Sequence, residues 1–162
     1  MTAMATSGTA VVSTPAETQI MIRREFAAPK HLVYRAWTTP ELITRWWAGK
    51  RGTVTVADVD LRLGGKWRWV MIAGGGFEVA FSGEYREIVP NERLVYTERY
   101  EAVPGPGILC TLEFAEKGGS TTVTLLSECG SRQVRDMILA SGMEGGMQEG
   151  WDLLEQVAMS LA

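Results

Sequence analysis

Few side chains of this sequence could take part in a reaction, and Glu98 is one candidate. It alternates with Leu94, Tyr96 and Tyr100, so a strand here would turn its carboxylate toward the same face as these apolar side chains. A carboxylate on such a face must be paired or hydrogen-bonded to offset its burial. Beside Tyr85 or Tyr96 it could orient the hydroxyl group of a bound ligand. The alternative is a strand end or a slip in the alternation that leaves Glu98 in water.

Arg24 and two aspartates raise the same question. Arg24 shares its alternation with Ile22 and Phe26, so it lies either at a strand end or inside the protein with a partner. Asp58 and Asp60 are weaker candidates of the same kind. Catalysis would require two or more titratable groups to converge on one apolar pocket. An enzyme is therefore the less favoured alternative, and no catalytic residue is predicted.

No metal site and no cofactor are predicted. His31 is the only histidine and is expected to be exposed in the first turn of a short helix. Cys110 and Cys129 have no histidine close in sequence, so the spacing of a metal site is absent. The two cysteines are expected on neighbouring strands but out of register for a disulfide. Free thiols are typical of a reducing compartment, so the cytoplasm is the expected location.

Aromatic side chains and methionines are concentrated in a few segments, where they serve either as core or as the walls of a cavity for an apolar ligand. Trp46 and Trp47 are adjacent, so on a helix they diverge by about 100°, and one can face the interior while the other guards the rim. The candidate ligand-binding residues are Trp46, Trp47, Trp67, Trp69, Phe81, Tyr85, Tyr96, Glu98, Leu112, Met143, Met147 and Trp151.

Glycines in the last segment bear on the same question. Gly142, Gly145, Gly146 and Gly150 fall close together, although glycine costs up to about 1 kcal/mol relative to alanine inside a helix. Either the helix is broken there, or the missing side chains leave space above a sheet.

The elements that must position these residues follow from periodicity. Strands are predicted over residues 18–26, 53–61, 66–72, 77–89, 93–101, 108–115 and 121–128. Helices are predicted over 30–38, over 39–49 with Thr39 as N-cap, over 132–140, and from Met143 onward. In the last helix Met147, Trp151 and Leu154 belong to one apolar stripe. This order indicates an α+β protein with helices on one face of an antiparallel sheet.

Composition limits the partners. The net charge is −3 and no run of Lys or Arg is present, which argues against nucleic acid and anionic membranes. No stretch of 18 apolar residues could span a membrane. Residues 1–16 are rich in Thr, Ala and Ser and are predicted to be a disordered leader, followed by a single domain over 17–162. A monomer or a weak homodimer is expected.

Several motifs together resemble the AHSA-type family, which is named for the activator of the heat-shock protein 90 ATPase and belongs to the START-like (SRPBCC) superfamily. The motifs are Trp46-Trp47, Asp60 to Trp67, Phe81 to Tyr85, Ile88 to Tyr96, Gly142-Met143 and Gly150-Trp151, and the resemblance covers about Glu17 to Ala162. It implies a helix-grip fold, in which a seven-stranded antiparallel sheet wraps a long C-terminal helix and two short helices follow the first strand. It also implies a deep cavity between sheet and helix.

The resemblance implies no single activity, because superfamily members bind lipids, sterols, hormones or polyketides, and some are cyclases or aromatases. The leading hypothesis is a protein that binds a small apolar or aromatic molecule. The alternatives are an interaction module of the stress response that activates a chaperone ATPase, and a cyclase or hydrolase that acts inside the cavity.

Overall fold

Strands of alternating burial form one antiparallel sheet in this computed structural model, which describes residues 9–162. The seven predicted strands are β2 (Gln19–Phe26), β3 (Gly52–Val59), β4 (Lys66–Ala73), β5 (Glu78–Val89), β6 (Arg93–Tyr100), β7 (Ile108–Lys117) and β8 (Ser120–Glu128). Each lies within a few residues of its predicted bounds. The sheet order is β1-β2-β8-β7-β6-β5-β4-β3, so consecutive strands from β3 to β8 are neighbours. Strand β2 lies beside β8, and β1 forms the edge next to β2.

An eighth strand corrects the prediction of a disordered leader. Strand β1 (Val11–Ser13) pairs with β2, and Val11 lies opposite Arg23. Ala10 is buried, and its backbone N–H and C=O bond the Gln148 side chain at 3.0 and 2.8 Å. The composition of this segment gave no sign of these contacts because its partners lie far along the chain. The rest of the predicted leader, residues 1–8, lies outside the described residues.

The helices agree with the prediction except for one. Helix α2 (Lys30–Thr38), α4 (Arg132–Ala140) and α5 (Met143–Ser160) match the periodicity. Helix α3 is only Pro40–Ile43, and irregular turns replace the predicted helix up to residue 49. Thr39 precedes it as predicted, but its side chain makes no capping hydrogen bond. Within residues 9–162, no helix is long and apolar enough to cross a membrane.

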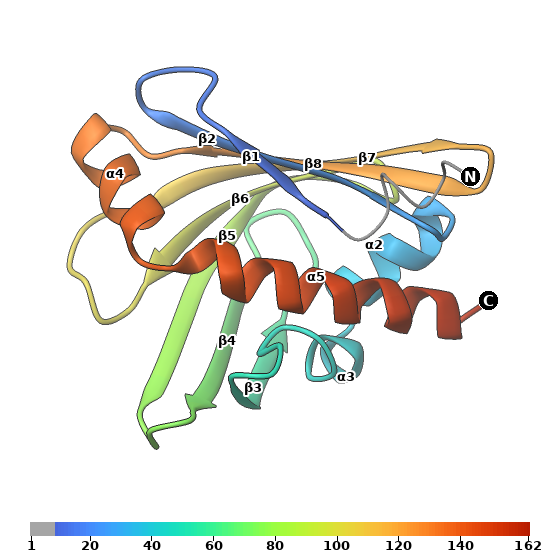
Figure 1. The fold of residues 1–162 in the computed structure, drawn as a ribbon, viewed down its shortest axis with the longest axis horizontal. Helices are drawn as coiled ribbons and strands as arrows, with labels where there is room; N and C mark the ends of the chain where they lie inside the picture. The colour runs from blue at the N-terminus through green and yellow to red at the C-terminus, as the bar shows by residue number, and fades with distance from the viewer. Residues whose placement is uncertain (1–8) are drawn as a thin grey trace.

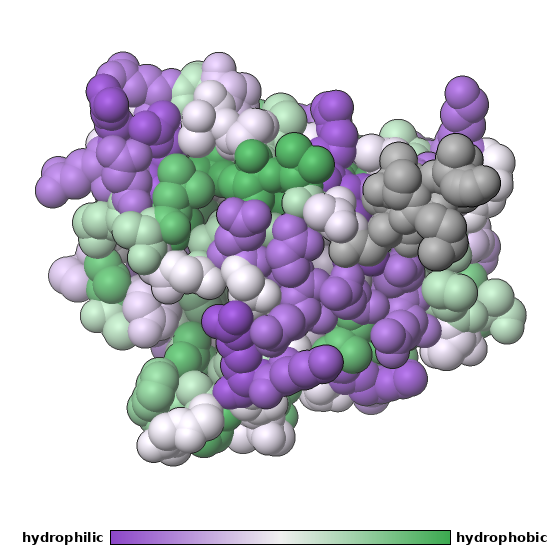
Figure 2. All heavy atoms as spheres, viewed as in Figure 1, coloured by the Kyte–Doolittle hydropathy of each residue, from purple (hydrophilic) through white to green (hydrophobic). Residues whose placement is uncertain are grey.

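The sheet curves around α5, which crosses its concave face, while α2 and α3 lie toward the C-terminal end of α5 (Figure 1). Trp151 and Leu154 of α5 are buried, as the apolar stripe predicts, and Ala158 continues the stripe as a buried residue one turn further on. The outer face of α5 is hydrophilic (Figure 2). The result is the helix-grip arrangement, with the core between α5, α2 and the inner face of the sheet.

Candidate functional site

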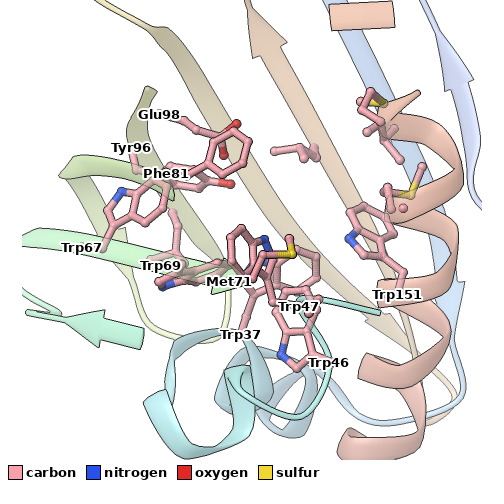
Figure 3. Close-up of a pocket in the computed structure, with 18 of the residues that line it drawn as sticks. Trp37, Trp46, Trp47, Trp67, Trp69, Met71, Phe81, Tyr96, Glu98 and Trp151 are labelled. Atoms are coloured by element: carbon pink, nitrogen blue, oxygen red, sulfur yellow. The ribbon is translucent and has the colours of Figure 1, made fainter. Parts of the chain in front are cut away.

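A cavity of about 300 Å³ lies between the inner face of the sheet, the turn after α3 and helix α5, and it is partly open to solvent. This sheet–helix cavity is lined by Ile22, Trp37, Trp46, Trp47, Ala48, Arg51, Trp67, Trp69, Met71, Phe81, Tyr85, Leu94, Tyr96, Glu98, Leu125, Met143, Gly146, Met147, Gly150 and Trp151. Figure 3 shows Trp67, Tyr96 and Glu98 on the sheet side and Trp151 on the opposite side, on α5.

All of the candidate ligand-binding residues except Leu112 lie on this cavity. Leu112 is fully buried on β7, where it pairs with Leu94 on one side and Leu125 on the other. Leu112 lies on the inner face of the sheet, as the alternation predicts. Its side chain is covered by its neighbours, however, and belongs to the packed core. Alternation identifies the inner face of a sheet, and cannot tell which part of that face is left open.

Residues that the sequence reasoning missed complete the walls. Trp37 of α2 is buried and contacts Trp46 and Trp151, with ring centroids 5.3 Å apart in each pair. Met71 continues the inward alternation of Trp67 and Trp69 and could have been named from that pattern. No pattern in the sequence indicates Arg51 as a cavity residue, because its position beside α5 depends on how the chain folds after α3.

Gly83 explains how the wall on β4, β5 and β6 is built. A Cβ atom at this position would lie 1.7 Å from the carbonyl oxygen of Thr97 and 2.7 Å from Nε1 of Trp67, so no larger residue fits. The missing side chain lets the indole of Trp67 reach across β5, where Nε1 donates to the Thr97 carbonyl at 3.2 Å. The Trp67 ring thereby meets Tyr96 edge to face, with centroids 5.8 Å apart.

The adjacent tryptophans after α3 diverge, although this segment forms turns in place of the helix on which that prediction was based. Trp46 is buried, and its Nε1 donates to the Ala36 carbonyl at 2.9 Å. Trp47 is only partly buried and packs edge to face on Trp69 and Phe81, at 5.6 and 5.9 Å between centroids. Edge-to-face contacts of this kind hold the rings in fixed relative orientations.

The glycines of α5 divide into different roles. Gly142 has a φ of +83° and ends α4, so it breaks the helical segment as the composition allowed. At Gly145 a Cβ would lie 2.7 Å from a guanidinium nitrogen of Arg51, so the space left by this glycine is filled by that side chain. Gly150 brings the helix close to the backbone of Trp46, 3.2 Å from the position of a Cβ. Only Gly146, with no atom nearer than 4.0 Å, leaves open space at the cavity wall.

Glu98 is the only carboxylate that lines the cavity within residues 9–162. It is partly exposed, and no hydrogen bond or ion pair to its side chain is found in the described part of the chain. Burial among apolar groups raises the pKa of Glu98 to about 7, because the charged form loses hydration. Burial also raises the pKa values of Tyr85 and Tyr96, so both phenols stay protonated at neutral pH.

The other titratable candidates lie elsewhere. Arg24 lies inside the protein with partners and not at an exposed strand end. Its guanidinium pairs with Asp152 at 2.7 Å and with Glu155 at 3.0 Å. Asp58, Asp60 and His31 are exposed and away from the cavity. Cys110 and Cys129 are buried free thiols.

Comparisons with known proteins agree with this architecture. A family model described as "Activator of Hsp90 ATPase homolog 1-like protein" matches residues 27–159. A solved protein from Rhodobacter sphaeroides is 24% identical over 95% of this chain and 100% of its own, with a TM-score of 0.86. One from Nitrosomonas europaea is 27% identical over 91% of this chain and 98% of its own, with a TM-score of 0.81. An AHSA1-like protein from Aeromonas hydrophila is 22% identical over 87% and 93%, with a TM-score of 0.65. No curated protein matches this chain.

Proposed function

This chain belongs to the family of activator of Hsp90 ATPase homolog 1-like proteins, and we propose that it binds a small, largely apolar or aromatic molecule in the sheet–helix cavity. One observation carries the proposal: a cavity of about 300 Å³ that is walled by aromatic rings and contains a single carboxylate. Small-molecule sites typically combine an apolar concave wall with a few polar groups that fix orientation, and this volume is at the lower end of their range.

The walls are suited to one flat or compact ligand. Trp67, Trp69 and Phe81 present their rings from the sheet and Trp47 from the turn after α3, while Met143 and Met147 come from α5. Methionine side chains adapt to ligands of different shape because they are unbranched and polarisable. We therefore expect a hydrophobic dye or a flat aromatic compound to bind with micromolar affinity, about −8 kcal/mol.

Met147→Trp tests this proposal, because the larger side chain would fill space between helix and sheet. If the cavity holds the ligand, this variant loses dye binding, measured by fluorescence titration, at little cost in stability. Gln156→Trp adds the same side chain on the exposed face of α5 and should bind the dye as the wild type does. Wild-type protein that binds no dye, together with a Met147→Trp variant destabilised by about 1–3 kcal/mol, would show packed core in place of a ligand site.

Native mass spectrometry of freshly purified protein complements the titration. A small molecule that stays bound in the gas phase adds a defined mass, and that mass should be absent from Met147→Trp. The mass would identify the ligand, which the dye cannot do.

Activation of a chaperone ATPase is a second candidate function, and the description of the matching family favours it. Addition of the purified protein to the chaperone of its own host should then raise the ATPase rate. Dye binding without any change in that rate would favour the ligand-binding function alone.

Catalysis inside the cavity is a third candidate, favoured by a carboxyl group whose pKa is about 7. A group with this pKa can both accept and donate a proton near neutral pH. Incubation of a co-purified ligand with fresh protein would reveal the activity as a product of changed mass, absent when Glu98→Gln is used.

A further inference from the structure

We propose that the sheet–helix cavity selects organic cations, with an ammonium group beside Glu98 and an apolar or aromatic body along the tryptophans. This inference rests on the proposed function, because it names the class of molecule that the same cavity would bind. The observations behind it are the unpaired carboxylate and the rings arranged around it.

Within residues 9–162, no cationic side chain pairs with Glu98. The guanidinium of Arg51, which lines the cavity, pairs with Glu149 at 3.3 Å. That of Arg68 pairs with Glu101 at 2.9 Å. A carboxylate that is partly withdrawn from water without a partner is unfavourable in the empty protein. A ligand that brings its own positive charge would remove that cost.

Aromatic rings surround the position of Glu98. Along β6 the side chains of Tyr96, Glu98 and Tyr100 share one face, so a ring lies on each side of the carboxylate. Phe81 stacks on Tyr100 with centroids 5.1 Å apart, and Trp67 meets Tyr96 edge to face at 5.8 Å. Tyr85 pairs with Tyr96 and Phe81 with Tyr100, a register that places Gly83 opposite Glu98. The Cβ position of Gly83 lies 2.7 Å from Nε1 of Trp67, so an indole occupies the space over this glycine.

This combination matches the chemistry of an ammonium ion. The electron-rich faces of Trp, Tyr and Phe attract organic cations, and the attraction increases where water is excluded. A neutral ligand would gain little from the charge of Glu98, and an anion would be repelled by it. Figure 3 shows the carboxylate and the labelled rings of Trp67, Phe81 and Tyr96 together on the sheet side, which leaves the side toward Trp151 for the apolar body.

Binding of a cation should strengthen as pH rises through neutrality. The ligand requires ionised Glu98, whose pKa is about 7, so the ionised fraction increases about tenfold between pH 6 and pH 8. The neighbouring titratable groups, on β5, β6 and β7, do not change their charge between pH 6 and pH 8. Burial raises the pKa values of Tyr96 on β6, Tyr85 on β5 and Cys110 on β7, and the guanidinium of Arg51, which also lines the cavity, pairs with Glu149.

Competition between three probes and a bound hydrophobic dye tests the inference. The probes are benzyltrimethylammonium, its uncharged isostere neopentylbenzene, and the anion 3-phenylpropanoate. At pH 8 the ammonium probe should displace the dye from the wild type at a concentration about tenfold below that of the isostere. This ratio should fall toward one in Glu98→Gln and should stay unchanged in Glu144→Gln, which removes an exposed carboxylate at the start of α5. Between pH 6 and pH 8 the ratio should rise about tenfold in the wild type and remain flat in Glu98→Gln.

The outcomes separate this inference from the function on which it rests. Equal displacement by the ammonium probe and its isostere, or a ratio that Glu98→Gln leaves intact in a folded variant, would overturn cation selection while leaving a ligand-binding cavity. Tighter competition by 3-phenylpropanoate would overturn it in favour of recognition through Arg51. Absence of dye binding to the wild type would instead overturn the proposed function itself.

Discussion

At the scale of single residues, Glu98 should make stability fall as pH rises. Its folded pKa of about 7 is above the ordinary value of 4.5, so between these values the folded state holds a proton that the unfolded state has released. The full contribution is therefore present below pH 4.5 and is lost as pH rises toward 7, with a slope of at most about 1.4 kcal/mol per pH unit.

Urea unfolding of the wild type and Glu98→Gln from pH 4.5 to pH 8 measures this effect. Glutamine does not titrate, so the stability of the wild type relative to the variant should decrease up to about pH 7 and then level off. Parallel curves across the whole range would mean that the carboxyl group is well hydrated.

Two carboxylates of α5 flank the buried guanidinium of Arg24. Glu155 accepts from that guanidinium at 3.0 Å and from the Ala27 N–H at 2.8 Å. Glu155→Ala should therefore lower the free energy of unfolding by about 2 kcal/mol, because buried Arg24 loses one of its two partners. Glu144→Ala, at an exposed position of the same helix, should change it by less than about 0.5 kcal/mol. Equal values from urea unfolding would show that the ion pair contributes nothing.

At the scale of elements, Gly83 of β5 and Gly146 of the cavity wall should respond in opposite directions to alanine. Gly83→Ala would place a Cβ 1.7 Å from the Thr97 carbonyl, so β5 and β6 must separate, at a cost of about 3 kcal/mol. Gly146→Ala meets no atom nearer than 4.0 Å and should stabilise α5 by up to about 1 kcal/mol. Thermal unfolding of both variants gives the comparison. A neutral Gly83→Ala would contradict the crossing of Trp67 over β5.

At the scale of the whole molecule, the first and last elements hold each other. Gln148 of α5 bonds both backbone groups of Ala10, and β1 follows directly. Gln148→Ala should cost about 1–2 kcal/mol and increase amide exchange along β1, which pairs with β2. Gln156→Ala, exposed on the same helix, is the control. Unchanged exchange in Gln148→Ala would show that pairing with β2 alone holds the strand.

Much of the architecture follows from the sequence alone. Alternation over β2 to β8 and the stripe of Trp151, Leu154 and Ala158 depend on local spacing. The inward faces of the strands and of α5 can therefore be predicted from the sequence. The family resemblance and the helix-grip fold are confirmed by the family model and by the arrangement of the sheet. The inner-face positions of Trp67, Tyr85, Tyr96 and Glu98 come from the same alternation.

Contacts between segments that are distant in the chain depend on the tertiary structure. Whether an inward residue is covered or left open depends on its neighbours, which is why Leu112 is core while Glu98 lines the cavity. Three further contacts join such segments: Trp67 crosses Gly83 to bond Thr97, Arg51 packs against Gly145, and β1 pairs with β2. Local periodicity reports the face on which a side chain lies, because it follows backbone geometry. The partner on that face is set by the packing of the whole chain, and no local pattern encodes it.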